Sequence, residues 1–152
     1  MRVKSLPYKE GSLFLLPLRD GRQALGVVAR MDGKGTILAY FFVCDGEDVQ
    51  EGRATLSAER ADLIAQVGDL GLLNGSWYVV GIIDGWSRAA WPLPEFHRIV
   101  DGNVIVSRYD DQLRFVAERP GLQYETKELP RDVLMGYGAA EIWLTALRNN
   151  EC

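Results

Sequence analysis

The first 44 residues alternate between apolar runs and short polar turns. Residues 12–18 and 22–31 are rich in strand-forming residues, and Arg19-Asp20-Gly21 separates them, a turn in which glycine takes a positive φ at no steric cost. A second glycine-containing turn, residues 32–35, leads into residues 36–44, which are mostly β-branched or aromatic. The pattern predicts three antiparallel strands in a meander.

These runs place bulky side chains on both faces of the predicted sheet. Leu15 and Leu16 are neighbours, as are Tyr40, Phe41 and Phe42, and neighbouring residues of a strand point to opposite faces. A strand that is apolar on both sides needs a covering layer on both sides. We therefore expect a second layer of structure over each face of this sheet.

Two segments carry helical patterns. Ser57 is a suitable N-cap, apolar residues follow on one side, and Gly68 suits a helix end, so residues 57–68 are expected to contain a short helix. Near the C-terminus, apolar residues follow the i, i+3, i+4, i+7, i+8 template of an amphipathic helix: Ala139, Ile142, Trp143, Ala146 and Leu147. This second helix, over residues 139–148, is expected to pack Trp143 against the sheet.

The central part of the chain predicts further strands. Residues 77–83, 96–100, 103–108 and 112–117 are β-prone and are separated by turns rich in Asp and Gly, while residues 118–130 are polar enough to form a long loop. Trp77 alternates with apolar neighbours and is expected in the core. The predicted fold is one α+β domain spanning residues 1–152, with a strongly curved, mainly antiparallel sheet or partly open barrel and two short helices, the C-terminal one amphipathic.

Charge and composition exclude several classes of protein. The chain has 152 residues, 17 basic and 21 acidic, and its net charge of -4 is opposite in sign to that of a general nucleic-acid binder. Its longest uncharged stretch, residues 70–83, is too short and too rich in glycine to span a bilayer, and the N-terminal residues are not expected to form a secretory signal. We expect a cytoplasmic protein with no membrane contact and no direct binding to nucleic acid.

No residue pattern indicates catalysis or a cofactor. Cys44 and Cys152 form neither a disulfide framework nor a zinc motif, and His97 is the only histidine, with no Gly-x-Ser-x-Gly elbow elsewhere. Residues 33–36 lack the upstream glycine of a phosphate-binding loop and are read as a hairpin turn. The expectation is a protein with no enzymatic activity, no metal and no cofactor. The alternative is a small hydrolase-like enzyme in which His97 and Asp84 line a pocket.

Two groups of residues are typical of binding surfaces. Trp86 and Trp91 flank Arg88 in a loop, and tryptophan with arginine is common at binding hot spots, although a loop tryptophan more often fills the edge of the core. Asp45, Glu47 and Asp48 form an acidic segment after the third strand, which suits either a solvated turn or a docking face for a basic partner.

Six motifs of glycine, proline and aromatic residues follow one another along the chain. They are GSLFLLPL at residues 11–18 with Asp20-Gly21, Gly26-Val27-Val28, Tyr40-Phe41-Phe42, Gly75-Ser76-Trp77 with Gly81, Trp91-Pro92 with Pro94 and Phe96, and Gly136-Tyr137-Gly138 before the last helix. In this order they resemble the immunity protein 26 family of bacterial polymorphic toxin systems. The resemblance covers most of the chain, and its motifs consist of residues that determine fold.

The resemblance implies an antitoxin that binds a cognate toxin through a protein–protein interface. It carries over no catalytic residue and implies no cofactor. The candidate toxin-binding residues, chosen by residue type and loop position, are Asp45, Glu47, Asp48, Trp86, Arg88 and Trp91. The alternative to an immunity protein is the small enzyme, or a small-ligand or interaction module that uses residues 84–98.

Overall fold

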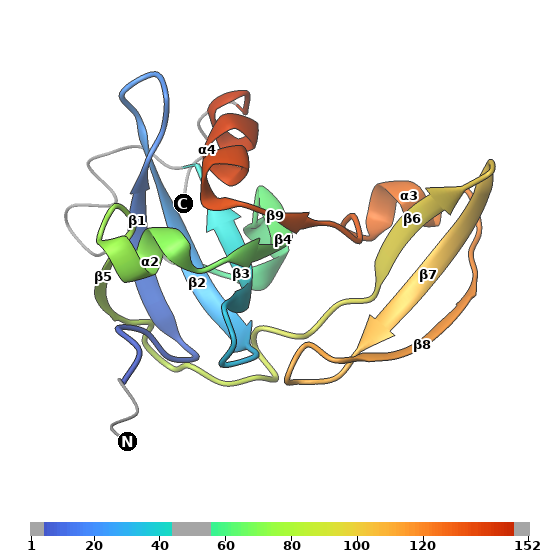
Figure 1. Cartoon of the computed structure of the whole chain (residues 1–152), viewed down its shortest axis with the longest axis horizontal. Helices are drawn as coiled ribbons and strands as arrows, with labels where there is room; N and C mark the ends of the chain where they lie inside the picture. The colour runs from blue at the N-terminus through green and yellow to red at the C-terminus, as the bar shows by residue number, and fades with distance from the viewer. Residues whose placement is uncertain (1–4, 44–55, 148–152) are drawn as a thin grey trace.

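The computed structural model describes residues 5–43 and 56–147, which contain two β-sheets and several short helices (Figure 1). The larger sheet has the order β5-β1-β2-β3-β4-β9 and the smaller has the order β6-β7-β8. The strands are β1 Ser12–Pro17, β2 Gln23–Met31, β3 Thr36–Phe42, β4 Leu63–Gly68, β5 Tyr78–Ile82, β6 Phe96–Val100, β7 Asn103–Tyr109, β8 Phe115–Pro120 and β9 Leu134–Met135. The helices are the 3-10 helix η1 Ala58–Arg60 and the α-helices α2 Leu70–Asn74, α3 Glu125–Glu128 and α4 Tyr137–Thr145.

The predicted meander is confirmed. β1 pairs with β2 and β2 with β3, all antiparallel, and the turns lie at the predicted glycine-containing positions. The α+β class is also confirmed, with a mainly antiparallel larger sheet that does not close into a barrel. The described residues hold three short α-helices where the sequence predicts two, and none of these helices is long and apolar enough to cross a membrane.

Each face of the larger sheet has its own apolar core, as the double-sided strands predict. On one face Phe14, Phe41 and Trp77 are fully buried, and α2 and α4 cover them. On the other face a second cluster includes Tyr40 and Phe96, which is contributed by the smaller sheet. The two sheets are therefore joined through this second core.

The helix predicted over residues 57–68 is wrong. Only Ala58–Arg60 are helical, as one 3-10 turn, and Leu63–Gly68 form β4. A strand is favoured over a helix here because successive residues of a strand point to opposite faces of the sheet. Ala65 packs in the first cluster and Ile64 packs against the second. In a helix these two neighbours would not lie on opposite sides, and the edge of β3 would lack its hydrogen-bonded partner.

Helix α4 exists as predicted, but the packing predicted for Trp143 is wrong. Its buried residues are Ala140, Glu141 and Leu144, whereas Ile142 and Trp143 are 59% and 39% exposed. The helix is turned this way because Glu141 accepts a hydrogen bond of 2.8 Å from the buried Trp77 Nε1. The apolar stripe read from the sequence thus lies mainly on the outer side of the helix.

The last predicted strand is shifted along the chain. β8 covers Phe115–Pro120 where residues 112–117 are predicted, and the expected loop over 118–130 also holds α3. The cause is Asp110, whose carboxylate accepts hydrogen bonds from the amides of Gln112 and Arg114 and holds residues 110–114 in a turn.

Candidate functional site

The loop between β5 and β6 carries three of the predicted binding residues. Trp86 is half-buried and covers Gly11, where an added Cβ would lie 2.8 Å from the indole Cγ. Arg88 is exposed, with 49% of its side chain accessible. Trp86 and Arg88 thus lie at the surface on a loop fixed against the start of β1.

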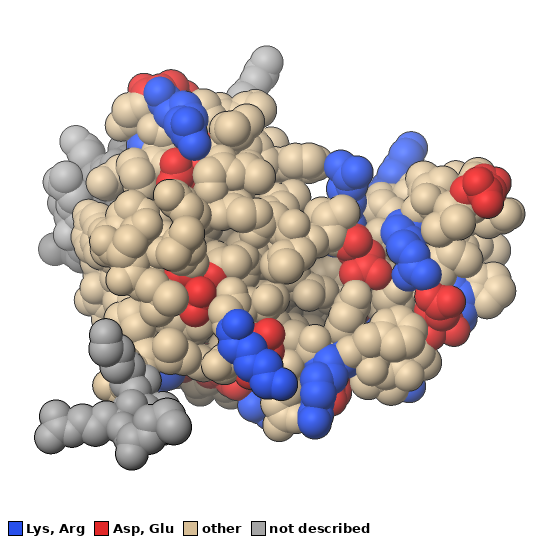
Figure 2. Space-filling view, viewed as in Figure 1, with Lys and Arg blue, Asp and Glu red and all other residues tan. Residues whose placement is uncertain are grey.

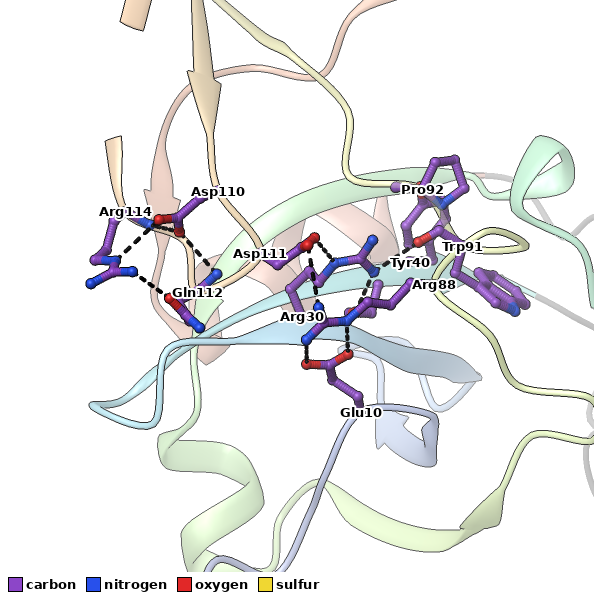
Figure 3. Close-up of polar contacts among 11 residues, drawn as sticks. Glu10, Arg30, Tyr40, Arg88, Trp91, Pro92, Asp110, Asp111, Gln112 and Arg114 are labelled. Carbon is purple, nitrogen blue, oxygen red and sulfur yellow. Dashed lines mark hydrogen bonds and ion pairs between the residues drawn. The ribbon is translucent and has the colours of Figure 1, made fainter. Parts of the chain in front are cut away.

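A chain of charged groups holds this loop to three other segments (Figure 3). Arg88 donates to both carboxylate oxygens of Glu10, at 2.8 and 2.9 Å, and lies 3.2 Å from Asp111. Asp111, in the β7–β8 turn, also accepts a 2.7 Å hydrogen bond from Arg30 Nε on β2. The four groups carry two positive and two negative charges, so the network is neutral and joins both sheets to the loop.

Arg30 is the buried centre of this network, with 3% of its area exposed. Besides Asp111, its guanidinium donates to the carbonyl oxygens of Ala29 and Trp91 at 2.6 and 2.9 Å. The hydrogen bond from Arg30 lowers the pKa of the Asp111 carboxyl below its usual range, so this carboxylate stays ionised at neutral pH.

Replacing Arg30 by methionine is expected to lower the free energy of unfolding by about 2–3 kcal/mol, because two carbonyl oxygens and Asp111 lose their donor. Arg88→Met is the matched control and is expected to cost no more than about 1 kcal/mol, since its ion pairs are exposed to solvent. Urea unfolding followed by tryptophan fluorescence measures both. Equal effects of the two substitutions would contradict the buried role of Arg30.

The toxin-binding role predicted for Trp91 does not fit its place in the fold. The side chain is 3% exposed and packs edge-to-face against Tyr40 and Phe42, with ring centroids 5.2 and 6.0 Å apart. The Tyr40 hydroxyl donates to the carbonyl oxygen of Pro92, which fixes the next residue as well. Trp91 is therefore a core residue that anchors the loop, and of the three candidate residues on the loop Trp86 and Arg88 are the two that reach the surface.

The other predicted binding residues, Asp45, Glu47 and Asp48, lie outside the described residues. They lie in the sequence between β3 and η1. Their acidic docking role stays a prediction.

A cavity of about 430 Å³, which the sequence did not predict, lies between the edge of β4 and the segment around α3. It is lined by Ala61, Asp62, Leu63, Ile64, Ala65, His97, Thr126, Lys127, Glu128, Leu129, Pro130, Arg131, Met135 and Trp143. Charged side chains of both signs lie on the side of the molecule where the smaller sheet meets the larger one (Figure 2).

His97 lies at this cavity in a structural position. Its Nδ1 is 2.8 Å from the carbonyl oxygen of Leu129, and because a carbonyl only accepts, Nδ1 carries the proton. Its backbone amide donates to Pro130 O and its carbonyl accepts from the Asp132 amide. Asp84 is not among the residues that line this cavity, so the cavity does not bring together the two residues of the alternative enzyme. Among the described residues no group of three or more His, Cys, Asp or Glu side chains is placed to hold a metal.

The far wall of the cavity is anchored to the smaller sheet by an ion pair. Arg119 on β8 donates to both carboxylate oxygens of the buried Glu125, at 3.1 and 2.7 Å, and the Leu122 amide donates to the same carboxylate at 3.0 Å. These hydrogen bonds, that from Arg119 above all, lower the pKa of Glu125 from 4.5 to about 2. The residues of α3 are thereby held in place across from β4.

This ion pair predicts a pH dependence of stability. A carboxyl group whose pKa is lowered by folding stabilises the folded state above its unfolded pKa, and the stabilisation is lost as pH falls toward 2. Urea unfolding at a series of pH values is expected to show a steeper loss of stability below pH 4.5 in the wild type than in Glu125→Gln. The same slope in both proteins would contradict the role given to Glu125.

Comparison with known families assigns the chain. The model of the family described as Immunity protein 26 matches residues 9–104, which are 96 of the 152 residues. The chain belongs to the immunity protein 26 family. The matched region runs from just before β1 into β7 and contains Trp86, Arg88 and the β4 wall of the cavity, while α3, β9 and α4 lie beyond it. No curated protein and no solved structure matches the chain.

Proposed function

We propose that this chain is an immunity protein that binds a cognate toxin of a bacterial polymorphic toxin system and neutralises it through a protein–protein interface. The match to the immunity protein 26 family over residues 9–104 carries this proposal. A fixed surface supports it physically, because binding through a loop already held by Arg30, Glu10 and Asp111 avoids the entropic cost of ordering that loop.

In this role the protein acts by occupancy alone. It needs no cofactor and no catalytic group, works in the cytoplasm as one domain of residues 1–152, and binds neither nucleic acid nor membrane directly. Trp86 and Arg88 are the proposed contacts on the loop after β5. Asp45, Glu47 and Asp48 are proposed as a second, acidic contact for a basic toxin surface.

Co-expression tests the proposal. Tagged protein is used to capture a partner from the source organism, and the captured partner's toxin domain is then expressed with and without this chain. We expect the toxin domain alone to stop growth, co-expression to restore it, and the purified pair to form a stoichiometric complex. A toxin domain that remains toxic in the presence of the chain, or failure to capture any such partner while toxins are expressed, overturns the proposal.

A further inference from the structure

Only part of the outer edge of strand β4 pairs with a neighbouring strand. β9 pairs with it in parallel at two positions, Gln66 and Val67. The preceding residues Leu63, Ile64 and Ala65 pair with β3 on one side, and no described residue bonds to their backbone on the other. Because the amides of a strand point alternately to its two neighbours, one or two of these three residues present their backbone groups outward.

The cavity of about 430 Å³ opens directly on this edge. Leu63, Ile64 and Ala65 all line it, and the chain from Thr126 to Arg131 forms the wall across from them. Trp143 of α4 also lines it, and the guanidinium of Arg131 lies 5.6 Å from the centre of the Trp143 ring. A free strand edge, apolar side chains and one exposed tryptophan thus meet in a single recess.

These features together favour an extended polypeptide segment as the molecule that binds in the recess. Outward-facing amides and carbonyls of a strand are satisfied by the backbone of another extended chain, and adjacent apolar pockets then hold its alternate side chains. Charged residues of both signs, Asp62, Lys127, Glu128 and Arg131, line the recess, as in the polar rim of a protein interface.

The wall opposite β4 argues against a second copy of this chain as the occupant of the recess. Pairing of two β4 edges would require two folded sheets to approach within about 5 Å in the hydrogen-bonding direction, perpendicular to the strands. Residues 126–131 line the recess across from β4, so a second sheet would have to fit between them and the strand, whereas an extended segment is only one strand wide.

We propose that the recess receives an extended segment of the toxin, which adds to β4 beside Leu63–Ala65, in line with β9, and places an apolar side chain against Trp143. This inference rests on the proposed function for the identity of the partner. It adds a toxin-binding surface to the proposed contacts Trp86 and Arg88, neither of which lines the recess.

Hydrogen exchange on the complex tests the pairing. The probe is the toxin domain that the co-expression experiment identifies, and exchange is followed for the amides of residues 63–65 in the free protein and in the complex. One or two of these amides are expected to exchange freely without toxin and at least tenfold more slowly with it. Amides that are already protected in the free protein, or that the toxin leaves unchanged, overturn the proposal.

Two substitutions on α4 test the contact. Trp143→Ala is expected to weaken toxin binding at least tenfold, because it removes an aromatic anchor from the recess. Ile142→Ala is the matched control: this residue is 59% exposed on the same helix but does not line the cavity, and its removal is expected to change affinity less than threefold. Equal effects of the two substitutions overturn the proposal.

The outcomes separate the two proposals. A wild-type chain that neither binds nor neutralises the toxin domain rejects the proposed function together with this inference. A wild-type chain that neutralises the toxin while residues 63–65 and Trp143 are unaffected rejects the recess alone and leaves the function standing.

Discussion

Gly26→Ala is expected to destabilise the fold by about 3 kcal/mol or more, because the new methyl group has no room. Gly26 lies in the middle of β2, directly opposite Phe14 on β1, and a Cβ at this position would lie 2.1 Å from the Phe14 Cζ. Phe14 cannot move away, since its ring stacks on Trp77 at 5.4 Å and meets Phe41 at 6.0 Å. The clash is therefore transmitted to the whole first core.

Gly136→Ala serves as the control for this substitution. Gly136 has a φ of -69°, which alanine also adopts, and an added Cβ would meet nothing within 4 Å. Its substitution is expected to change the free energy of unfolding by less than about 0.5 kcal/mol. Denaturant unfolding of the two variants measures the difference, and a Gly26→Ala protein as stable as Gly136→Ala would show that β1 and β2 are not packed as described.

Trp77→Ala is expected to cost about 3–5 kcal/mol, the range for removing a large buried aromatic residue. Trp77 is fully buried, contacts the rings of Phe14, Phe41 and Tyr137, and donates its Nε1 hydrogen to the buried carboxylate of Glu141. Its loss opens a cavity in the first core and removes the hydrogen bond that sets the orientation of α4.

Trp143→Ala is the matched control for Trp77→Ala. Its ring is 39% exposed and the Arg131 guanidinium lies 5.6 Å from its centre, so we expect a loss of no more than about 1 kcal/mol. Thermal unfolding followed by circular dichroism distinguishes the two tryptophans. Comparable losses of stability would mean that Trp143 also packs in the core, as the sequence pattern alone suggests.

The sequence predicts those parts of the fold that depend on residues close together in the chain. The hairpins of β1, β2 and β3 follow from turn glycines between β-prone runs, and β6 matches its predicted range at both ends. Residues 57–68 were misread because a capping serine and spaced apolar residues are equally compatible with a strand that serves two cores. The rotation of α4 depends on Glu141 meeting Trp77, a contact between residues 64 apart that no periodicity encodes.

The candidate site likewise has a part that the sequence predicts and a part that depends on contacts between distant residues. The loop with Trp86, Arg88 and Trp91 was found because tryptophan and arginine stand out in a sequence, but which of them is buried depends on Arg30 and Tyr40, two distant strand residues. The recess beside β4 was missed entirely. Its walls come from five separate stretches of chain, none of which has an unusual composition, and the two-residue length of β9 leaves the edge open.

The bond between Arg30 and Asp111 also bears on how long the folded state lasts. It closes a loop between residues 81 positions apart, and contacts of such long range are generally formed after the local hairpins during folding. An interaction that is absent from the folding transition state slows unfolding without speeding folding. The network around Arg30 is therefore expected to slow unfolding, so that the native protein lasts longer once it has folded.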